Sequence, residues 1–339
     1  MAVLSTSAIE PSKMPRPKLA IAGAGRVGSA LALLLSQRGW PICGVWSRSP
    51  DSAGRLAQQV GATTWTDPAD LAEAELVLVT VPDGAIGDCA QVIAQAGGWH
   101  EGQGVVHCSG GVEVSALAPA QAAGAWIGGF HPLQAFATVE AALAVLPGSF
   151  FALEGDGPLC TWLPALVESL NGTGQWLAAG ARPLYHAGAV FASNYVVTLF
   201  SVGVRLLTQA GGSTERSPET SASSVESLAE VSGEPRSRRR LAEVLTPAQA
   251  AAALLRLTEG AVHNLAAVGL PGALTGPIRR GDAQTVARHL AALDADAPDL
   301  ADLYRALAWQ TLPLAQALNL DPQALDEVAQ VVRAECLTQ

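Results

Sequence analysis

Lysine is almost absent from this chain of 339 residues, since Lys13 and Lys18 are the only two and both precede the end of the first predicted strand. A lysine in the body of the protein is therefore excluded as a catalytic base or Schiff-base former. This removes enzymes that depend on pyridoxal phosphate, and also the P-loop nucleoside triphosphatases, whose phosphate loop requires a lysine. The chemistry must rest on other side chains.

Paired cysteines and long apolar runs are also missing. Neither a disulfide framework nor a zinc ribbon is indicated, because the five cysteines are odd in number and form no CxxC pair. No stretch of about 20 uninterrupted apolar residues occurs, and the first 17 residues lack the apolar core of a signal peptide. These absences predict a soluble protein of the reducing cytoplasm. The scattered cysteines are Cys43, Cys89, Cys108, Cys160 and Cys336.

Positive charge is scarce as well. The formal net charge is −10 and the sequence pI is about 5.0. Such a balance argues against nucleic acid or an anionic membrane as a partner. We therefore expect a small-molecule substrate.

The most informative segment that is present follows an apolar stretch at residues 18–22. It is a GxGxxG motif, in which the first glycine permits a tight turn, the second lets a pyrophosphate approach the backbone and the third lets a helix pack on the sheet. The helix that follows offers free N–H groups to the phosphates. The predicted dinucleotide-binding residues are Gly23, Ala24, Gly25, Arg26, Val27 and Gly28.

The residues at the end of the second predicted strand indicate which dinucleotide binds. An NAD site would carry Asp or Glu about 20 residues past the glycines, to bind the ribose hydroxyls. Ser47, Arg48 and Ser49 stand there instead. This favours a 2′-phosphate and therefore NADP(H), although an arginine in a solvated loop is the alternative for Arg48.

Further apolar strands alternate with helical patterns as far as about residue 180, with strands near 63–65, 76–81, 104–107, 126–130, 150–153 and 175–177. Unbroken apolar strands between helices predict a doubly wound parallel sheet of the Rossmann type, in an α/β domain. From residue 181 only helical patterns follow, including one long helix from Pro183 to Leu207. We expect a tail at 1–17, an NADP-binding domain at 18–180 and an all-helical domain at 181–339. Residues 211–240 are rich in Gly, Ser, Pro and charge, which predicts a disordered insert.

Residues that follow strands of a doubly wound sheet reach the ligand crevice. Val81, Pro82 and Asp83 follow the fourth strand, although a turn with a helix N-cap would explain the last two equally well. Cys108 and Ser109 follow the fifth strand, and the Ser109 hydroxyl is expected to bind the nicotinamide or a substrate carboxylate. His131 follows the sixth.

The helix predicted to open the second domain carries His186, Ser193 and Asn194. At about 100° per residue, these side chains line one side of a single helix. The alternative is a polar stripe satisfied against the sheet domain. A metal site is not expected, because no histidine pair has i, i+4 spacing or a nearby acidic partner.

Several motifs together carry a family resemblance. They are GAGRVG, the Pro82-Asp83 turn, His107-Cys-Ser-Gly110, Phe130-His-Pro-Leu-Gln134, the stretch Tyr185-His through Asn194-Tyr, and Leu274-Thr-Gly-Pro-Ile through Asp282. The chain resembles bacterial proteins that pair a Rossmann-like domain with an all-helical domain of unknown function, in the superfamily of ketopantoate reductase, pyrroline-5-carboxylate reductase and 6-phosphogluconate dehydrogenase. The resemblance implies NADP-dependent oxidoreduction and a homodimer formed through the helical domain.

One departure from the better-known relatives concerns the proton donor. Ketopantoate reductase carries a lysine on the equivalent helix, and here His186 stands near that place. With an ordinary pKa of about 6.5, His186 is the expected general acid, with His131 as its rival and with Ser193 or Asn194 orienting the substrate. We expect reduction of a small oxo acid or an imine. A non-catalytic NADP(H) sensor and a deazaflavin-dependent NADP oxidoreductase are the alternatives.

Overall fold

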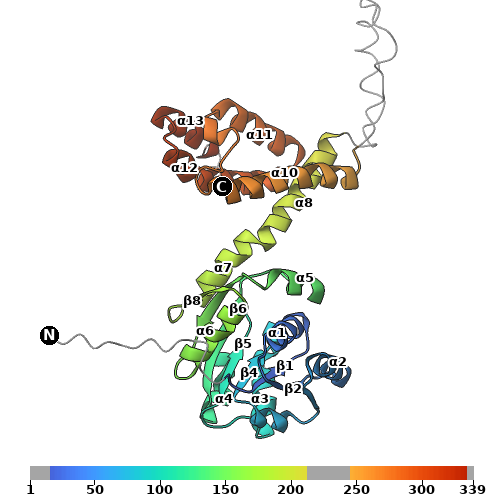
Figure 1. Cartoon of the computed structure of the whole chain (residues 1–339). Coiled ribbons are helices and arrows are strands. Elements are labelled where there is room, and N and C mark those ends of the chain that lie inside the picture. The colour runs from blue at the N-terminus through green and yellow to red at the C-terminus, as the bar shows by residue number, and fades with distance from the viewer. Residues whose placement is uncertain (1–15, 212–244, 334–339) are drawn as a thin grey trace, which may run out of the picture. The chain divides into compact units, whose positions relative to one another are not determined.

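The structure, a computed structural model, describes residues 16–211 and 245–333. The predicted tail at 1–17 and the predicted insert at 211–240 lie almost wholly outside the described residues. The chain divides into two compact units, Met1–Asn194 and Tyr195–Gln339. The first unit contains the sheet and the second contains helices (Figure 1). The sequence predicts a domain boundary at residue 180, directly after the last strand. The two compact units instead divide after Asn194, one helix further along the chain.

One eight-stranded sheet forms the centre of the first unit, in the order β3-β2-β1-β4-β5-β6-β7-β8. The order reverses between β1 and β4, which makes this the switch point where ligands of open α/β sheets bind. The strands are β1 (Leu19–Ala22), β2 (Ile42–Trp46), β3 (Thr63–Trp65), β4 (Leu76–Val79), β5 (Gly104–His107), β6 (Trp126–Pro132), β7 (Phe150–Glu154) and β8 (Thr173–Trp176).

Helices connect the strands and make up the second unit. In the first unit they are α1 (Arg26–Gln37), α2 (Pro50–Val60), α3 (Ile86–Gln95), α4 (Ala118–Ala122), α5 (Val139–Val145), α6 (Leu159–Ser169) and α7 (Arg182–Ala192), with short 3-10 helices such as η3 (Asp83–Ala85). In the second unit they are α8 (Asn194–Ala210, beginning at the division), α10 (Pro247–Val268), α11 (Ala283–Asp296), α12 (Ala301–Ala317) and α13 (Pro322–Arg333).

The doubly wound sheet followed by helices confirms the predicted fold class, but one strand pair departs from a parallel sheet. β7 pairs with β6 in the antiparallel direction, with Pro132 opposite Phe151. The intervening helix α5 has seven residues and is about 10 Å long, whereas β6 spans about 23 Å. Because α5 cannot return the chain along the length of β6, β7 begins beside the end of that strand.

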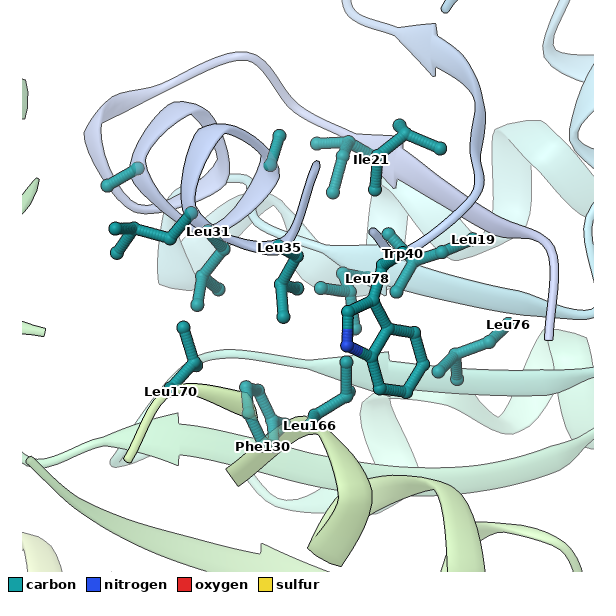
Figure 2. Close-up of a cluster of buried hydrophobic side chains, with 14 of the residues drawn as sticks. Leu19, Ile21, Leu31, Leu35, Trp40, Leu76, Leu78, Phe130, Leu166 and Leu170 are labelled. Atoms are coloured by element: carbon teal, nitrogen blue, oxygen red, sulfur yellow. The ribbon is translucent and has the colours of Figure 1, made fainter. Parts of the chain in front are cut away.

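Alternate side chains of the central strands build two cores. Leu19 and Ile21 of β1 belong to the core on one face of the sheet, and Ala20 and Ala22 belong to the core on the other. Figure 2 shows the first of these, where the indole of Trp40 lies among leucines of β1, β4 and α1. Burial on both faces explains why these strands are apolar throughout.

The predicted long helix from Pro183 to Leu207 is wrong as a single element. α7 ends at Ala192 and α8 begins at Asn194, while Ser193 between them leaves helical geometry, with φ −128° and ψ −73°. The Ser193 hydroxyl donates to the carbonyl of Ala189 at 2.7 Å. Serine competes with the backbone for hydrogen bonds, and such bonding to the residue four positions earlier bends helices.

The second unit has a small core and two poorly buried helices. Side chains of α11, α12 and α13, including Val286, Leu312 and Val328, form the core. α8 contains no buried residue and α10 contains one, Ala250. Large apolar side chains of α10 are exposed, among them Leu255, Leu257, Val262, Leu265 and Val268. By length and composition alone, one stretch among the described helices, Arg182–Ala210, is long and apolar enough to cross a membrane.

Candidate functional site

The glycine motif forms the turn from β1 into α1. Gly23 has a φ of +115°, which favours glycine, and its carbonyl accepts a hydrogen bond from Thr80 Oγ1 at 2.6 Å. A Cβ at Gly28 would clash with the Gly23 carbonyl and with Thr80. These two glycines are therefore required by the chain itself, for the turn and for close packing.

Gly25 differs, because neither its backbone nor its neighbours require glycine. Its φ is −86°, and the nearest atom to a Cβ built there is the Thr80 carbonyl oxygen at 3.9 Å. Gly25 is also the N-cap of α1, with no side-chain cap and no acidic residue in the first turn. Open space beside free N–H groups at a helix N-terminus is what a pyrophosphate requires, so the turn fits a dinucleotide. Ala24 and Val27 pack on the core below.

The sequence also predicts that Arg26 binds the cofactor, but its side chain extends from the glycine turn to the segment that follows β6. Its Nη1 donates to the carbonyls of Phe136 and Ala137, at 2.9 and 3.1 Å. These bonds link the glycine turn to the segment that follows β6.

Ser47, Arg48 and Ser49 lie at the end of β2, as expected. Ser49 is the N-cap of α2, where its hydroxyl accepts from the backbone N–H of Ser52. Arg48 is exposed. Arg55, which sequence reasoning missed, donates to the Ser52 hydroxyl at 3.1 Å. Arg48 and Arg55, with the hydroxyls of Ser47, Ser49 and Ser52, thus belong to the end of β2 and the first half of α2.

The turns after β4 and β5 continue the same edge of the sheet. Val81 lies against Gly23, and Asp83 lies in the first turn of η3, whose N-cap is Pro82. Burial raises the pKa of the Cys108 thiol to about 12, so Cys108 stays protonated and is no nucleophile. The Ser109 hydroxyl accepts from the N–H groups of Gly111 and Val112, at 3.2 and 3.0 Å, and so shapes the turn.

Two imidazoles converge on this turn. A Cβ at Gly110 would lie 2.7 Å from Nε2 of His131 and 2.8 Å from Nδ1 of His186. A Cβ at Gly111 would lie 2.9 Å from Cδ2 of His186. Neither glycine has a positive φ, so their small size is needed for this approach. The ring centroids of His131 and His186 are 6.4 Å apart, at an interplanar angle of 80°.

Tyr185 completes the cluster. Its hydroxyl oxygen lies 2.8 Å from Nδ1 of His131, and the two rings meet edge to face with centroids 5.6 Å apart. Burial raises the pKa of Tyr185 to about 12. The phenol therefore remains protonated at neutral pH and can donate a hydrogen bond.

Two histidines of the site are held neutral. Burial, and next the nearby charge of Arg182, lower the pKa of both His131 and His107 to about 4. The Nδ1 of His107 accepts from the backbone N–H of Ser109 at 3.2 Å, which places its proton on Nε2. Within the described residues, the buried Nδ1 of His186 has no hydrogen-bond partner. Such orphaned atoms are uncommon inside proteins and often mark a functional position.

Arg182, the first residue of α7, is fully buried beneath this cluster. Its guanidinium bonds the Glu154 carboxylate through Nε and Nη2, and it bonds the carbonyl of Ser109 through Nη1. Sequence reasoning missed Arg182, Glu154 and the role of Tyr185. A glycine at 129, inside an otherwise apolar strand, was the available signal, because a Cβ there would clash with Arg182.

The prediction that His186, Ser193 and Asn194 line one side of a single helix is only partly correct. His186 joins the cluster, but the break in the helix falls at Ser193, so the angles expected for a continuous helix do not apply. The Ser193 hydroxyl oxygen lies 2.9 Å from Asn194 Oδ1, in addition to its hydrogen bond within its own helix. Ser193 and Asn194 therefore form a local junction. Within residues 16–211 and 245–333, no group of three or more His, Cys, Asp and Glu could hold a metal ion.

Comparison with known domains agrees with this architecture. Residues 5–132 match a Rossmann-like domain, and residues 149–311 match DUF2520, a domain of unknown function. The chain pairs a Rossmann-like domain with a DUF2520 domain. This confirms the predicted pairing of a Rossmann-like domain with a domain of unknown function. No curated protein matches the chain.

Solved structures share the fold at low identity. The candidate NADP oxidoreductase BF3122 from Bacteroides fragilis is 24% identical, with a TM-score of 0.59, over 87% of this chain and 97% of that one. Protein TM1727 from Thermotoga maritima is 22% identical, with a TM-score of 0.62, over 89% and 100%. A reductive aminase from Aspergillus terreus, in complex with NADPH and ethyl levulinate, is 19% identical, with a TM-score of 0.51, over 90% and 99%.

Proposed function

We propose that this protein is an NADP(H)-dependent reductase of a small oxo acid or an imine. One observation carries the proposal: His131 and His186 converge on the Gly110–Gly111 turn, and Tyr185 bonds His131, at the sheet edge that also carries the glycine turn. Ligands of doubly wound sheets bind at this edge, so proton donors there face the reactive end of a bound dinucleotide. The shared fold with an NADPH-bound reductive aminase supports the proposal.

The residues present fit NADPH. Gly23, Gly25 and the first turn of α1 would hold the pyrophosphate, and Arg48 with the neighbouring serines would hold the 2′-phosphate. The Ser109 hydroxyl retains its own hydrogen, which is available to the nicotinamide amide or a substrate carboxylate. When bound, NADPH supplies the hydride that the substrate carbon receives.

The chain itself must supply one proton, to the carbonyl oxygen or the imine nitrogen. In the tautomer with a proton on Nδ1, His131 donates to the Tyr185 oxygen, which leaves the Tyr185 O–H free to donate to the substrate. His186 is the second donor, because its Nδ1 has no other partner among the described residues. A positioned acid typically contributes about 10² to 10⁴ in rate.

The test is turnover by the purified full-length protein. NADPH consumption is followed with a panel of 2-oxo acids, 3-oxo acids and cyclic imines, and binding of NADPH and NADH is measured separately. We expect NADPH binding and turnover of at least one class, abolished in a variant lacking both His131 and Tyr185 side-chain donors. Binding without turnover across the panel would contradict the enzyme and favour an NADP(H) sensor.

We also propose a homodimer, formed through the helical unit in the cytoplasm. The exposed apolar side chains of α8 and α10 support an interface, because monomeric proteins seldom expose patches of this kind. The four described cysteines are free thiols, which suits a reducing compartment. Sedimentation in buffer should give twice the monomer mass, whereas a monomer that partitions into vesicles would contradict this assignment.

A further inference from the structure

We propose that Arg182 is a positioning residue with two roles. Its buried guanidinium is a permanent cation that keeps His131 neutral, so that His131 can relay protons. It also fixes the turn after β5, against which the imidazoles of His131 and His186 pack. The inference rests on the proposed reductase function for its catalytic meaning. The effect of the Arg182 charge on the titration of His131 is a property of the protein itself and can be measured without a substrate.

The position of Arg182 relative to His131 follows from strand geometry. The Arg182 guanidinium occupies the space that a side chain at Gly129 would take. Residues 129 and 131 of β6 face the same side of the sheet, and their Cα atoms are about 7 Å apart. The cation and the imidazole are therefore neighbours on one face of one strand.

The guanidinium is held there by three bonds from a fully buried side chain. Glu154 on β7 accepts two of them, and the Ser109 carbonyl accepts the third. Ser109 opens the turn whose glycines contact His131 and His186. A single side chain thus connects β7, the turn after β5 and the start of α7. Moving Arg182 would displace the surface on which the imidazoles rest.

The charge of Arg182 has its own effect on His131. The other titratable groups that act on this imidazole are His186 on α7, Asp83 on η3 and His107 on β5, and Tyr185 bonds it directly. Asp83 favours the imidazolium, whereas Arg182, His186 and His107 oppose it. Arginine is the only one of the opposing groups that is charged at every working pH. Glu154 pairs with Arg182, so its carboxylate opposes part of the field of the guanidinium, and the experiment must separate the two charges.

A neutral imidazole is what a relay requires. It accepts a proton at one ring nitrogen and releases one from the other, whereas an imidazolium has no free lone pair. His131 is suitably placed, with Nδ1 on Tyr185 and Nε2 facing the turn beside His186. Replacement of a proton that Tyr185 has delivered would then pass through His131.

The experiment compares two variants that both lack the ion pair. Glu154→Gln keeps the cation, and the double variant Arg182→Met with Glu154→Gln removes it without leaving a buried unpaired carboxylate. The six histidines are titrated by NMR in the full chain, and the His131 signal is assigned by its loss in His131→Asn. Arg182→Lys is the conservative variant that restores the charge. Circular dichroism verifies that each variant is folded.

We expect the pKa of His131 to be higher in the double variant than in Glu154→Gln, and low again in Arg182→Lys. The pH midpoint of the acidic limb of NADPH turnover should shift upward by the same amount. Equal His131 titration in the two variants would overturn the inference, even if the reductase is active. If the titration of His131 shifts but neither the wild-type protein nor any variant turns over NADPH, the effect of Arg182 on His131 stands and the proposed reductase function is rejected.

Discussion

The hydroxyl of Tyr185 and Nδ1 of His131 lie 2.8 Å apart, although 54 positions separate these residues in the chain. One comes from the start of α7 and the other from the end of β6. The contact ties the helix to the sheet edge within the first unit. It also joins the Tyr185 phenol, whose pKa is raised to about 12, to the His131 imidazole, whose pKa is lowered to about 4. This pairing is the arrangement on which the proposed proton delivery depends.

Replacing Tyr185 by Phe should lower turnover by about a hundredfold or more and leave NADPH affinity within about twofold, because only the donor is removed. The chain offers a matched control. Tyr304 lies 2.9 Å from Nδ1 of His289 in the helical unit, an equivalent pair outside the proposed site. Tyr304→Phe should leave kcat and KM unchanged. Equal losses in both variants would show a general packing effect and remove Tyr185 from the mechanism.

Substitutions of the two histidines separate their roles. His186→Ala should lower kcat by at least about a hundredfold with NADPH affinity intact, if His186 is the final donor. His131→Ala should produce a comparable loss, because it interrupts the pair with Tyr185. Steady-state kinetics with the substrate found in the panel decide between them. Retained activity in His186→Ala together with loss in His131→Ala assigns the proton to His131 and Tyr185, and retained activity in both refutes the site.

The sequence predicted the sheet and the glycine turn between β1 and α1 well, because local signals specify both. Alternation of apolar strands and helices gives the strand positions, and glycine spacing gives the turn. The buried pair of Arg182 and Glu154 was not predictable, since two charged residues 28 positions apart carry no periodic signal. The break at Ser193 was missed for a related reason, because the apolar pattern continues through it and only a side-chain hydrogen bond marks it.

Two glycines of the same motif should respond differently to alanine. Gly25→Ala introduces no clash within the chain, so its melting temperature should barely change, while NADPH affinity falls by about tenfold or more as the Cβ meets the pyrophosphate. In Gly28→Ala the new Cβ clashes with the Gly23 carbonyl and with Thr80, so the melting temperature of this variant should fall well below that of Gly25→Ala. Thermal melts and NADPH titrations of both variants give the comparison. Unchanged NADPH affinity in Gly25→Ala would remove the phosphates from this turn.

Preference for NADPH should depend on Arg48. Charge-assisted bonds between arginine and phosphate contribute about 1.5 to 3 kcal/mol, so Arg48→Ala should weaken NADPH by roughly tenfold or more and leave NADH nearly unchanged. Arg256→Ala, on an exposed ion pair of α10, is the control for loss of one positive charge. Binding of both cofactors is measured by titration calorimetry. An equal loss for NADPH and NADH would show that Arg48 does not recognise the 2′-phosphate.

Acid should destabilise the first unit through His107 and His131. Both have folded-state pKa values of about 4, below the ordinary value of about 6.5, so the unfolded chain binds more protons between these limits. Stability is therefore fully present above pH 6.5 and is lost as the pH falls towards 4, by about 2 kcal/mol for each histidine at pH 5. Urea unfolding at pH 7.5 and pH 5 measures the difference. His131→Asn should remove about half of the pH dependence, whereas His100→Asn, at an exposed position, should leave it intact. An unchanged slope in His131→Asn would mean that His131 takes up its proton equally in the folded and the unfolded chain, which would contradict a lowered pKa for this imidazole.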